Sequence, residues 1–206
     1  MNLNLIQFSE LNEIDDLSAK FRDEIVIVAK NFSETELKEF NSKKRKSKVK
    51  LFSCKVLEKK DNKEFQKFKK LCDFIAVKGG SIEMNSWAAN QKADLLLQPF
   101  SSGKNAFDLA TANVLKENNV FTCFLFNDFL ETKGFGQTQL MKNAIFCLKL
   151  IEKSKAPLLF VSGAKEKQQM RASKDLSSFG VFLGMKKETA LKTIRKNSEK
   201  FLERLQ

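Results

Sequence analysis

Residues 74–99 read FIAVKGGSIEMNSWAANQKADLLLQP and contain two strand patterns separated by a helical pattern. Residues 74–77 are a short, continuous apolar run, and Gly79-Gly80 ends it with a turn. Residues 81–92 then have a helical pattern, and residues 94–97 form a second apolar run that ends at Pro99. Continuous apolar strands that alternate with helices are typical of a parallel sheet covered by helices. This stretch therefore predicts an α/β fold.

The same alternation extends over the whole chain. Nearer the N-terminus, after the strand pattern at residues 24–29, Ser33 and Glu36 form a capping-box pattern for a helix that runs into the basic segment 43–50. From Lys165 onward the pattern is helical, with Gly180 and Gly184 interrupting it before a basic C-terminal helix. Further strands are expected at residues 3–8, 24–29, 49–56, 120–126 and 157–162, and further helices at residues 13–23, 63–72, 106–118 and 137–153.

No Pro/Gly/Ser-rich linker divides the sequence, so residues 1–206 are expected to form a single domain. The patterns indicate about seven parallel strand–helix units. Such units either close into a TIM-like barrel or remain an open, doubly wound sheet, and periodicity alone leaves both open.

The charge of the chain favours a polyanionic partner. Lys plus Arg number 37 against 25 Asp plus Glu, a formal net charge of +12. A surplus of this size is typical of proteins that bind nucleic acid or an anionic membrane. A biased composition is an alternative reading, because the chain has 20 Phe and 0 Tyr.

The absence of histidine and the cysteine pattern exclude several kinds of site. With 0 His, the chain has no His-ligated metal site, no Ser-His-Asp or Cys-His triad and no imidazole acid–base chemistry. The four cysteines are scattered without a CxxC pair, which predicts buried, reduced thiols and a cytoplasmic protein. Residues 1–10 lack a signal-peptide pattern, and runs such as 120–126 are too short to cross a bilayer.

Parallel α/β folds bind ligands beyond the carboxyl ends of their strands. Those ends carry lysines, amides, one hydroxyl and one carboxylate, which suit hydrogen bonding to phosphate and ribose better than acid–base chemistry. They are Lys30, Asn31, Lys78, Gln98, Asn127, Asp128, Ser162 and Lys165.

The most distinctive local pattern covers residues 161–185. Ser162 ends an apolar strand, and Gly163 permits a tight turn into a helix whose N-terminus would receive phosphate beside Lys165 and Lys167. An ordinary strand–turn–helix joint with solvated lysines is the alternative. Arg171 and Asp175 are spaced for a helical ion pair.

Three blocks of the sequence resemble the p30 family of ribonuclease P subunits. Residues 162–185, SGAKEKQQMRASKDLSSFGVFLGM, look like the archaeal form of the family block T/S-S-G-A … R-x-P-x-D-L … L-G-M. Residues 77–100 are similar to its strand, asparagine-containing helix and following strand, and residues 105–126 to the segment after it. The resemblance covers residues 74–204 well and the first third weakly.

The resemblance implies a TIM-like barrel related to PHP-type phosphoesterases but without their metal ligands. It implies a noncatalytic RNA-binding subunit of ribonuclease P that supports the catalytic RNA in 5′ maturation of precursor tRNA. The Mg²⁺ would be held by the RNA, with no cofactor bound by the protein. The implied partners are ribonuclease P RNA, the ferredoxin-like component 2, other ribonuclease P proteins and, indirectly, precursor tRNA, in the archaeal cytoplasm.

Arg171 and Lys174 match basic positions of the family block, and a guanidinium binds phosphate bidentately. The sequence departs from the family pattern at Ser86, Ser173 and Gln98, where relatives often have a basic residue, a proline and a histidine. The residues expected to contact RNA are Arg171, Lys174, Lys165, Lys167, Lys78, Lys196 and Asn85.

Two features stay open at this stage. The basic run Lys43, Lys44, Arg45, Lys46, Lys48 and Lys50 is either a second RNA patch or a solvated helix end. Trp87 is expected to pack within the protein rather than stack on a base.

Two other functions also remain. A degenerate PHP-like phosphoesterase would need a carboxylate-only metal site drawn from Asp94, Asp128 and Glu131, which are dispersed in the sequence. A general RNA-binding scaffold outside ribonuclease P is the second alternative.

Overall fold

The strands pair in their sequence order and run parallel throughout. The computed structural model describes residues 2–203, and its sheet has the order β1-β2-β3-β4-β5-β6-β7. Every neighbouring pair is parallel. The strands are β1 (Leu3–Ile6), β2 (Ile25–Lys30), β3 (Lys50–Leu57), β4 (Phe74–Lys78), β5 (Leu95–Leu97), β6 (Phe121–Leu125) and β7 (Leu158–Val161).

The sheet curls until its two edges meet, at a junction between β1 and β7 that we call the seam. Ile6 forms a parallel bridge with Ala164, just beyond β7. The amide of Gly163 donates to the Leu5 carbonyl at 2.9 Å, and the amide of Gln7 donates to the Ala164 carbonyl at 2.6 Å. The fold is therefore a nearly closed, TIM-like barrel, which decides between the two architectures that the sequence left open.

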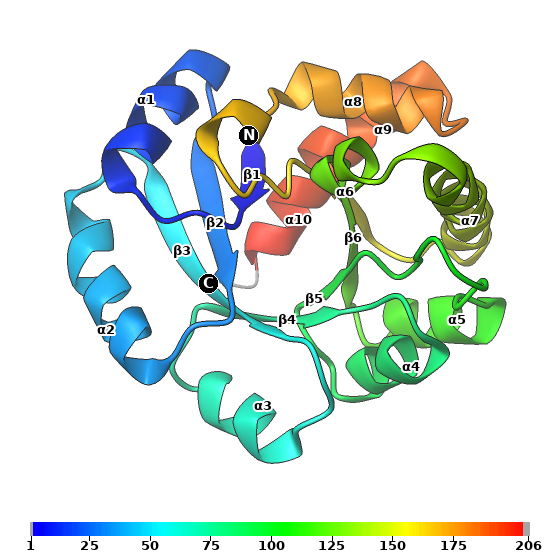
Figure 1. Ribbon diagram of the computed structural model, residues 1–206, viewed down its shortest axis with the longest axis horizontal. Helices are drawn as coiled ribbons and strands as arrows, with labels where there is room; N and C mark the ends of the chain where they lie inside the picture. The colour runs from blue at the N-terminus through cyan, green and yellow to red at the C-terminus, as the bar shows by residue number, and fades with distance from the viewer. Residues whose placement is uncertain (1, 204–206) are drawn as a thin grey trace.

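Helices surround the strands as an outer ring, with α1 and α8 on either side of the seam (Figure 1). The α-helices are α1 (Leu11–Phe21), α2 (Glu34–Lys43), α3 (Asn62–Phe68), α4 (Ile82–Asn90), α5 (Leu109–Glu117), α6 (Phe126–Glu131), α7 (Gly134–Ser154), α8 (Ser173–Phe182), α9 (Lys187–Lys192) and α10 (Ser198–Leu202). Two 3-10 turns, η1 (Lys44–Lys46) and η2 (Lys167–Gln169), and a π-helical turn, η3 (Thr193–Asn197), complete the secondary structure of the described residues.

Alternate residues of each strand face the barrel interior and form an apolar core separate from the one beneath the helices. The interior is closed at the amino ends of the strands by α10. The Phe201 ring lies 4.6 Å from the Phe74 ring and 5.1 Å from the Phe121 ring, between centroids. The barrel interior is thus a packed core, and ligands are expected only at its outer surfaces.

The capping box predicted at Ser33 is confirmed. Its hydroxyl accepts from the amide of Glu36 at 3.2 Å, and the Glu36 carboxylate accepts from the Ser33 amide at 2.7 Å. One prediction was wrong, and one helix was not predicted. Gly180 lies within α8 instead of interrupting it, because the missing side chain lets the helix approach Phe160, and a Cβ there would lie 3.1 Å from that ring. Helix α6 was not predicted, since its first residue, Phe126, continues the apolar run of β6 and the helix is only six residues long.

One lysine is buried in the outer layer of the barrel. The Lys55 side chain is 3% exposed, and its ammonium lies 2.8 Å from the Glu64 carboxylate. It also donates to the Phe32 carbonyl at 2.7 Å and lies 4.2 Å from the centre of the Phe68 ring. The contacts compensate the desolvation of the charge and tie β3 to α3.

Three of the four thiols are buried as predicted. Cys54, Cys123 and Cys147 are buried, Cys72 is partly exposed, and all four are free. Between residues 2 and 203, none of the helices combines the length and apolar character that a membrane crossing requires.

Candidate nucleic-acid interface

The loop between β7 and α8, residues 163–172, is fixed by hydrogen bonds to its own ends. The Ser162 hydroxyl accepts from the Arg171 amide at 2.9 Å and donates to the Arg171 carbonyl at 3.3 Å. The Asn4 amide also donates to the Arg171 carbonyl, at 3.1 Å. The Ser162 side chain, part of the family block, therefore fixes the backbone of Arg171, another residue of that block.

This loop corrects two predictions. Residues 163–164 bond back to β1 at the seam, so the chain does not turn directly into a helix, and α8 begins only at Ser173. The helix N-terminus expected beside Lys165 and Lys167 is therefore not present, and these residues lie before or within the turn η2. Arg171 precedes α8, and no ion pair joins it to Asp175 in the described part of the chain.

The Arg171 side chain shapes the loop instead. Its guanidinium donates to the carbonyls of Gln168 at 2.9 Å and Met170 at 2.8 Å. It also lies 5.6 Å from the centre of the Phe126 ring, within cation–π range. The side chain is partly exposed, so it can offer its remaining N–H groups to a phosphate.

A buried polar pair supports the loop from below. The Asn4 amide donates to a carboxylate oxygen of Asp23 at 3.2 Å, in addition to its bond to Arg171. Asp23 is 5% exposed, and burial raises the pKa of its carboxyl to about 6.

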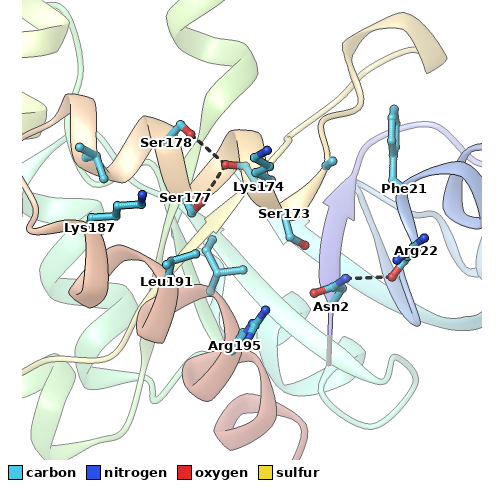
Figure 2. Close-up of a pocket in the computed structure, with 13 residues that line it drawn as sticks. Asn2, Phe21, Arg22, Ser173, Lys174, Ser177, Ser178, Lys187, Leu191 and Arg195 are labelled. Carbon is cyan, nitrogen blue, oxygen red and sulfur yellow. Dashed lines mark hydrogen bonds between the residues drawn. The ribbon is translucent and has the colours of Figure 1, made fainter.

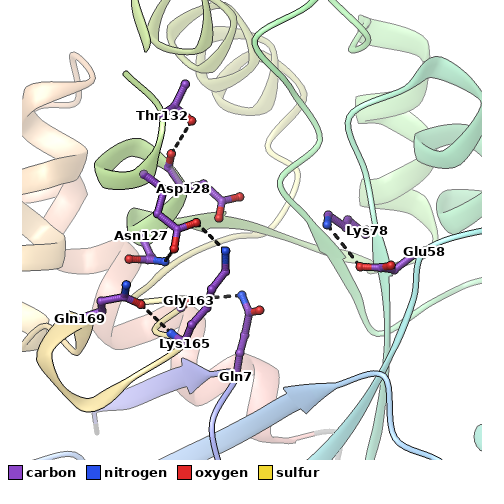
Figure 3. Close-up of polar contacts among 10 residues, drawn as sticks. Gln7, Glu58, Lys78, Asn127, Asp128, Thr132, Gly163, Lys165 and Gln169 are labelled. Carbon is purple, nitrogen blue, oxygen red and sulfur yellow. Dashed lines mark hydrogen bonds and ion pairs between the residues drawn. The ribbon is translucent and has the colours of Figure 1, made fainter. Parts of the chain in front are cut away.

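Three of the predicted lysines are paired with carboxylates at the carboxyl-end face of the barrel, and Figure 3 shows two of them, Lys78 and Lys165. Lys165 binds Glu131, which lowers the pKa of that glutamate, and Lys78 lies 3.3 Å from a carboxylate oxygen of Glu58. Lys167 lies 3.0 Å from Glu13. Exposed pairs of this kind are weak and leave little net charge, so this face is not strongly basic.

A groove with a volume of about 690 Å³ lies beside the seam. Figure 2 shows it between α1, α8 and the α9–η3 segment, with cationic side chains at its edge. We call it the seam groove. It is lined by Asn2, Phe21, Arg22, Ala172, Ser173, Lys174, Ser177, Ser178, Val181, Lys187, Leu191, Ile194 and Arg195.

The seam groove has an apolar floor and four cations, Arg22, Lys174, Lys187 and Arg195. No carboxylate pairs with any of these four within residues 2–203. Their charges are thus uncompensated, and an anionic ligand would be attracted here more than to the paired lysines of the carboxyl-end face.

Only one predicted RNA contact, Lys174, lines the seam groove. Lys196 is exposed beside it, but its neighbour Arg195 is the residue that faces the groove. Arg22, Lys187 and Arg195 were missed. Lys187 and Arg195 lie in the segments that follow α8, whereas Arg22 follows α1 and reaches the groove only because the barrel closes.

Asn85 was expected to contact RNA directly, but its side chain is fully buried. Its amide donates to the carbonyls of Pro99 and Ala106, both at 2.7 Å. Its oxygen accepts from the Gly80 amide at 3.2 Å. Asn85 therefore joins the turn after β4 to the segment after β5 and does not reach the surface.

The structure also shows the surroundings of Trp87 and of the basic run at residues 43–50. Trp87 packs against the Phe65 ring and donates to Asn62 at 3.0 Å, as expected for a packing residue. In the basic run, Lys44 lies 2.7 Å from Asp73 and Lys43 pairs with Glu39, so part of its charge is compensated.

The carboxylates considered for a metal site do not form one. Asp94 accepts from the Ile75 amide at 2.8 Å, and Glu131 is bound to Lys165. No group of three or more potential metal ligands occurs in the part of the chain that the structure describes.

Comparison with known proteins identifies the family. The family model described as RNase P subunit p30 matches residues 7–206. The chain belongs to the RNase P subunit p30 family. This confirms the resemblance drawn from the three sequence blocks and makes the chain a ribonuclease P protein subunit.

Individual p30 relatives agree with this assignment. Ribonuclease P protein component 3 of Thermococcus kodakarensis is 26% identical over 183 residues, covering 84% of this chain and 81% of the relative. The component 3 of Thermococcus gammatolerans is 25% identical over 199 residues, covering 94% and 93%. A chain in the cryo-EM structure of archaeal ribonuclease P with mature tRNA superposes with a TM-score of 0.85 at 19% identity, covering 98% of this chain and 90% of that one. The barrel is therefore the fold of this p30 protein.

Proposed function

We propose that this p30 protein is a noncatalytic RNA-binding subunit of ribonuclease P that supports the catalytic RNA in 5′ maturation of precursor tRNA. The observation that carries the proposal is the seam groove, where four cations without carboxylate partners line one cavity. The structural relative that comes from archaeal ribonuclease P with mature tRNA supports the same assignment.

In this proposal the groove cations neutralise phosphates where the RNA backbone is crowded. Lys174 and Arg195 approach the groove from α8 and η3, on opposite walls, and would contact successive phosphates. Arg171 and Lys196 extend the contact on either side. Release of counterions from the RNA supplies the free energy, which makes binding strongly dependent on salt.

The remaining parts of the proposal follow from the family. The Mg²⁺ of the reaction would belong to the RNA, and this chain would bind no cofactor of its own. The ferredoxin-like component 2 and other ribonuclease P proteins would be its protein partners, precursor tRNA an indirect one, and the archaeal cytoplasm its location.

Salt-dependent RNA binding tests the groove. Each phosphate contact contributes roughly 0.7–0.9 to the slope of log K against log salt, so Lys174→Glu with Arg195→Glu, which removes two contacts, should reduce the slope by about 1.4–1.8. Lys63→Glu with Lys70→Glu changes the net charge equally on α3 and just after it, at exposed positions far from the seam. An equal loss in both double variants would show that only total charge matters and would refute the groove as the contact.

Reconstitution tests the function itself. The cognate ribonuclease P RNA and component 2 are assayed for precursor-tRNA cleavage at moderate Mg²⁺, with and without this protein. Stimulation by the protein, reduced by the groove double variant, supports the proposal. Cleavage by the pure protein with Mn²⁺ would instead support the phosphoesterase alternative. Binding to diverse RNAs without stimulation would support a general scaffold.

A further inference from the structure

The floor of the seam groove has more apolar surface than a phosphate contact requires. Val181 is 41% exposed and Leu191 is 40% exposed, and the half-buried Phe21 lines the same groove. Single apolar side chains on a surface need no explanation, whereas several that line one groove mark a binding surface. The volume of about 690 Å³ lies in the range of pockets that enclose most of a drug-sized ligand. We therefore expect a ligand that offers apolar surface as well as charge.

The apolar floor is a fixed surface, because it is continuous with the core beneath the helices. Phe21 ends α1, Val181 lies in α8 and Leu191 lies in α9. Ile194 of η3 lines the groove with them and is only 5% exposed, and both Ile194 and Phe21 pack in the core under the outer helices. A ligand that covers this floor meets an ordered surface, so little free energy is lost to rearrangement of the protein.

Cations surround this apolar floor. The four groove cations are exposed, and Figure 2 shows Lys174, Lys187 and Arg195 around Leu191. The groove thus offers apolar contacts at its centre and positive charge at its edge. A complementary ligand has an apolar part with negative charges outside it.

The uncharged polar side chains of the groove are largely engaged within the protein. The Ser177 and Ser178 hydroxyls donate to the Lys174 carbonyl at 2.7 and 3.0 Å, and the Asn2 amide donates to the Arg22 carbonyl at 3.0 Å (Figure 2). A hydroxyl that donates its proton to a helix carbonyl cannot donate it to a base. The groove therefore suits the flat faces of bases better than their hydrogen-bonding edges, which predicts little sequence preference.

Duplex and single-stranded RNA differ in what they can offer this floor. In a duplex the bases are paired and stacked, and the outer surface consists of sugars and phosphates. Placing those groups against Val181 and Leu191 would remove them from water without hydrogen-bond partners, which costs free energy. In a single strand the bases can leave the stack, and their apolar faces pack on protein side chains.

We propose that the seam groove binds a single-stranded segment of RNA, with bases packed on the apolar floor and phosphates at the surrounding cations. The Phe21 ring supplies an aromatic face, and Val181 and Leu191 extend the surface. Burial of the base faces adds a contribution to affinity beside the salt-dependent phosphate contacts. The inference rests on the proposed RNA-binding function and adds the kind of RNA that the groove takes.

Fluorescence anisotropy of labelled RNA with the intact protein tests this preference. A single strand of about ten nucleotides, without self-complementarity, is compared at equal salt with a hairpin duplex that has the same number of phosphates. The single strand should bind at least about tenfold more tightly, because only its bases can pack on the floor. Equal or tighter binding of the duplex overturns the proposal.

Val181→Ser with Leu191→Ser removes part of the floor without changing the charge. This double variant should weaken binding of the single strand about tenfold, with an unchanged slope of log K against log salt and unchanged binding of the duplex. Phe135→Ser with Phe182→Ser is the matched control, since these side chains are 84% and 68% exposed and neither lines the groove. An equal loss in both double variants would mean that the floor is not the contact, and would refute the proposal.

A third variant decides the question if the floor variant does not fold. Phe21→Leu keeps an apolar side chain but removes the aromatic face, so it should weaken binding of the single strand about fivefold. Unchanged affinity of this variant would contradict packing of bases in the groove.

The charge variant separates this inference from the proposed function. Lys174→Glu with Arg195→Glu should lower the salt slope for both kinds of RNA. A lower slope without a preference for the single strand refutes only the inference, whereas an unchanged slope refutes the proposed phosphate contact as well. An amphipathic helical peptide of leucine and glutamate that binds as tightly as the single strand would assign the groove to a protein partner, and would also overturn the inference.

Discussion

Replacing Asn85 with alanine should destabilise the protein by about 4 kcal/mol, although the residue resembles a family position expected to contact RNA. The magnitude follows from its bonds. The carbonyls of Pro99 and Ala106 belong to buried residues and would lose their donor, each costing roughly 1–3 kcal/mol. Gly80 is only partly buried, so its amide can bond water instead and adds little.

Urea denaturation followed by circular dichroism measures this loss. Asn90→Ala is a matched control on the same helix, because Asn90 is exposed and bonds only to Ser86, and it should change stability by less than about 0.5 kcal/mol. Asn85→Asp should be at least as destabilising at neutral pH, since a carboxylate cannot donate to the two carbonyls. Near-normal stability of Asn85→Ala together with weakened RNA binding would refute this reasoning and restore the residue as an RNA contact.

Three further predictions are measured by urea denaturation, the last of them together with hydrogen exchange. Asp23→Asn should stabilise the protein by roughly 1–3 kcal/mol at pH 8 and little at pH 4. The pKa of the Asp23 carboxyl is raised to about 6, so the native state loses stability relative to the unfolded state as pH rises from about 4 to 6, and asparagine removes this loss. Equal effects at both pH values would contradict this. Lys55→Met should lower the free energy of unfolding by about 2–3 kcal/mol. The loss is smaller than for a fully buried ion pair, since the Glu64 side chain is 29% exposed and water can solvate its carboxylate. Unchanged stability would mean that the Lys55–Glu64 pair is not formed. Ser162→Ala should lower the free energy of unfolding by about 1–2 kcal/mol, because the Arg171 amide loses its acceptor, and should speed hydrogen exchange of that amide about tenfold or more. Unchanged exchange would show that the Ser162 hydroxyl does not fix the loop.

The strands could be predicted from sequence because each is a short apolar run bounded by polar or turn residues. The Ser33 capping box was equally visible, since all its bonds are local. Closure of the barrel could not be predicted, because it depends on backbone bonds between the end of β1 and residues 163–164 and on bonds from the Asn4 and Gln7 side chains to the backbone of residues 162–163. Such contacts join single residues far apart in sequence and leave no periodic signal.

The candidate site was less predictable than the fold. Lys165 and Lys167 were expected to contact RNA because they follow a strand, but their charges are compensated by Glu131 of α6 and Glu13 of α1. Arg195 was not expected, because it lies in the π-helical turn η3, which the sequence pattern does not indicate. Local motifs thus locate segments of the interface, whereas the balance of charge is a property of the assembled surface.

The position of α10 has a consequence for newly made chains. Water is excluded from the barrel interior only once Phe201 packs against Phe74 and Phe121. The Phe74 and Phe121 rings therefore stay exposed until nearly the whole described chain has left the ribosome. The segment that leads into α10 is η3, which carries Arg195 and forms one wall of the seam groove. Completion of the core and formation of the basic groove are therefore coupled, so an unfinished molecule lacks the surface that the proposed RNA contact requires.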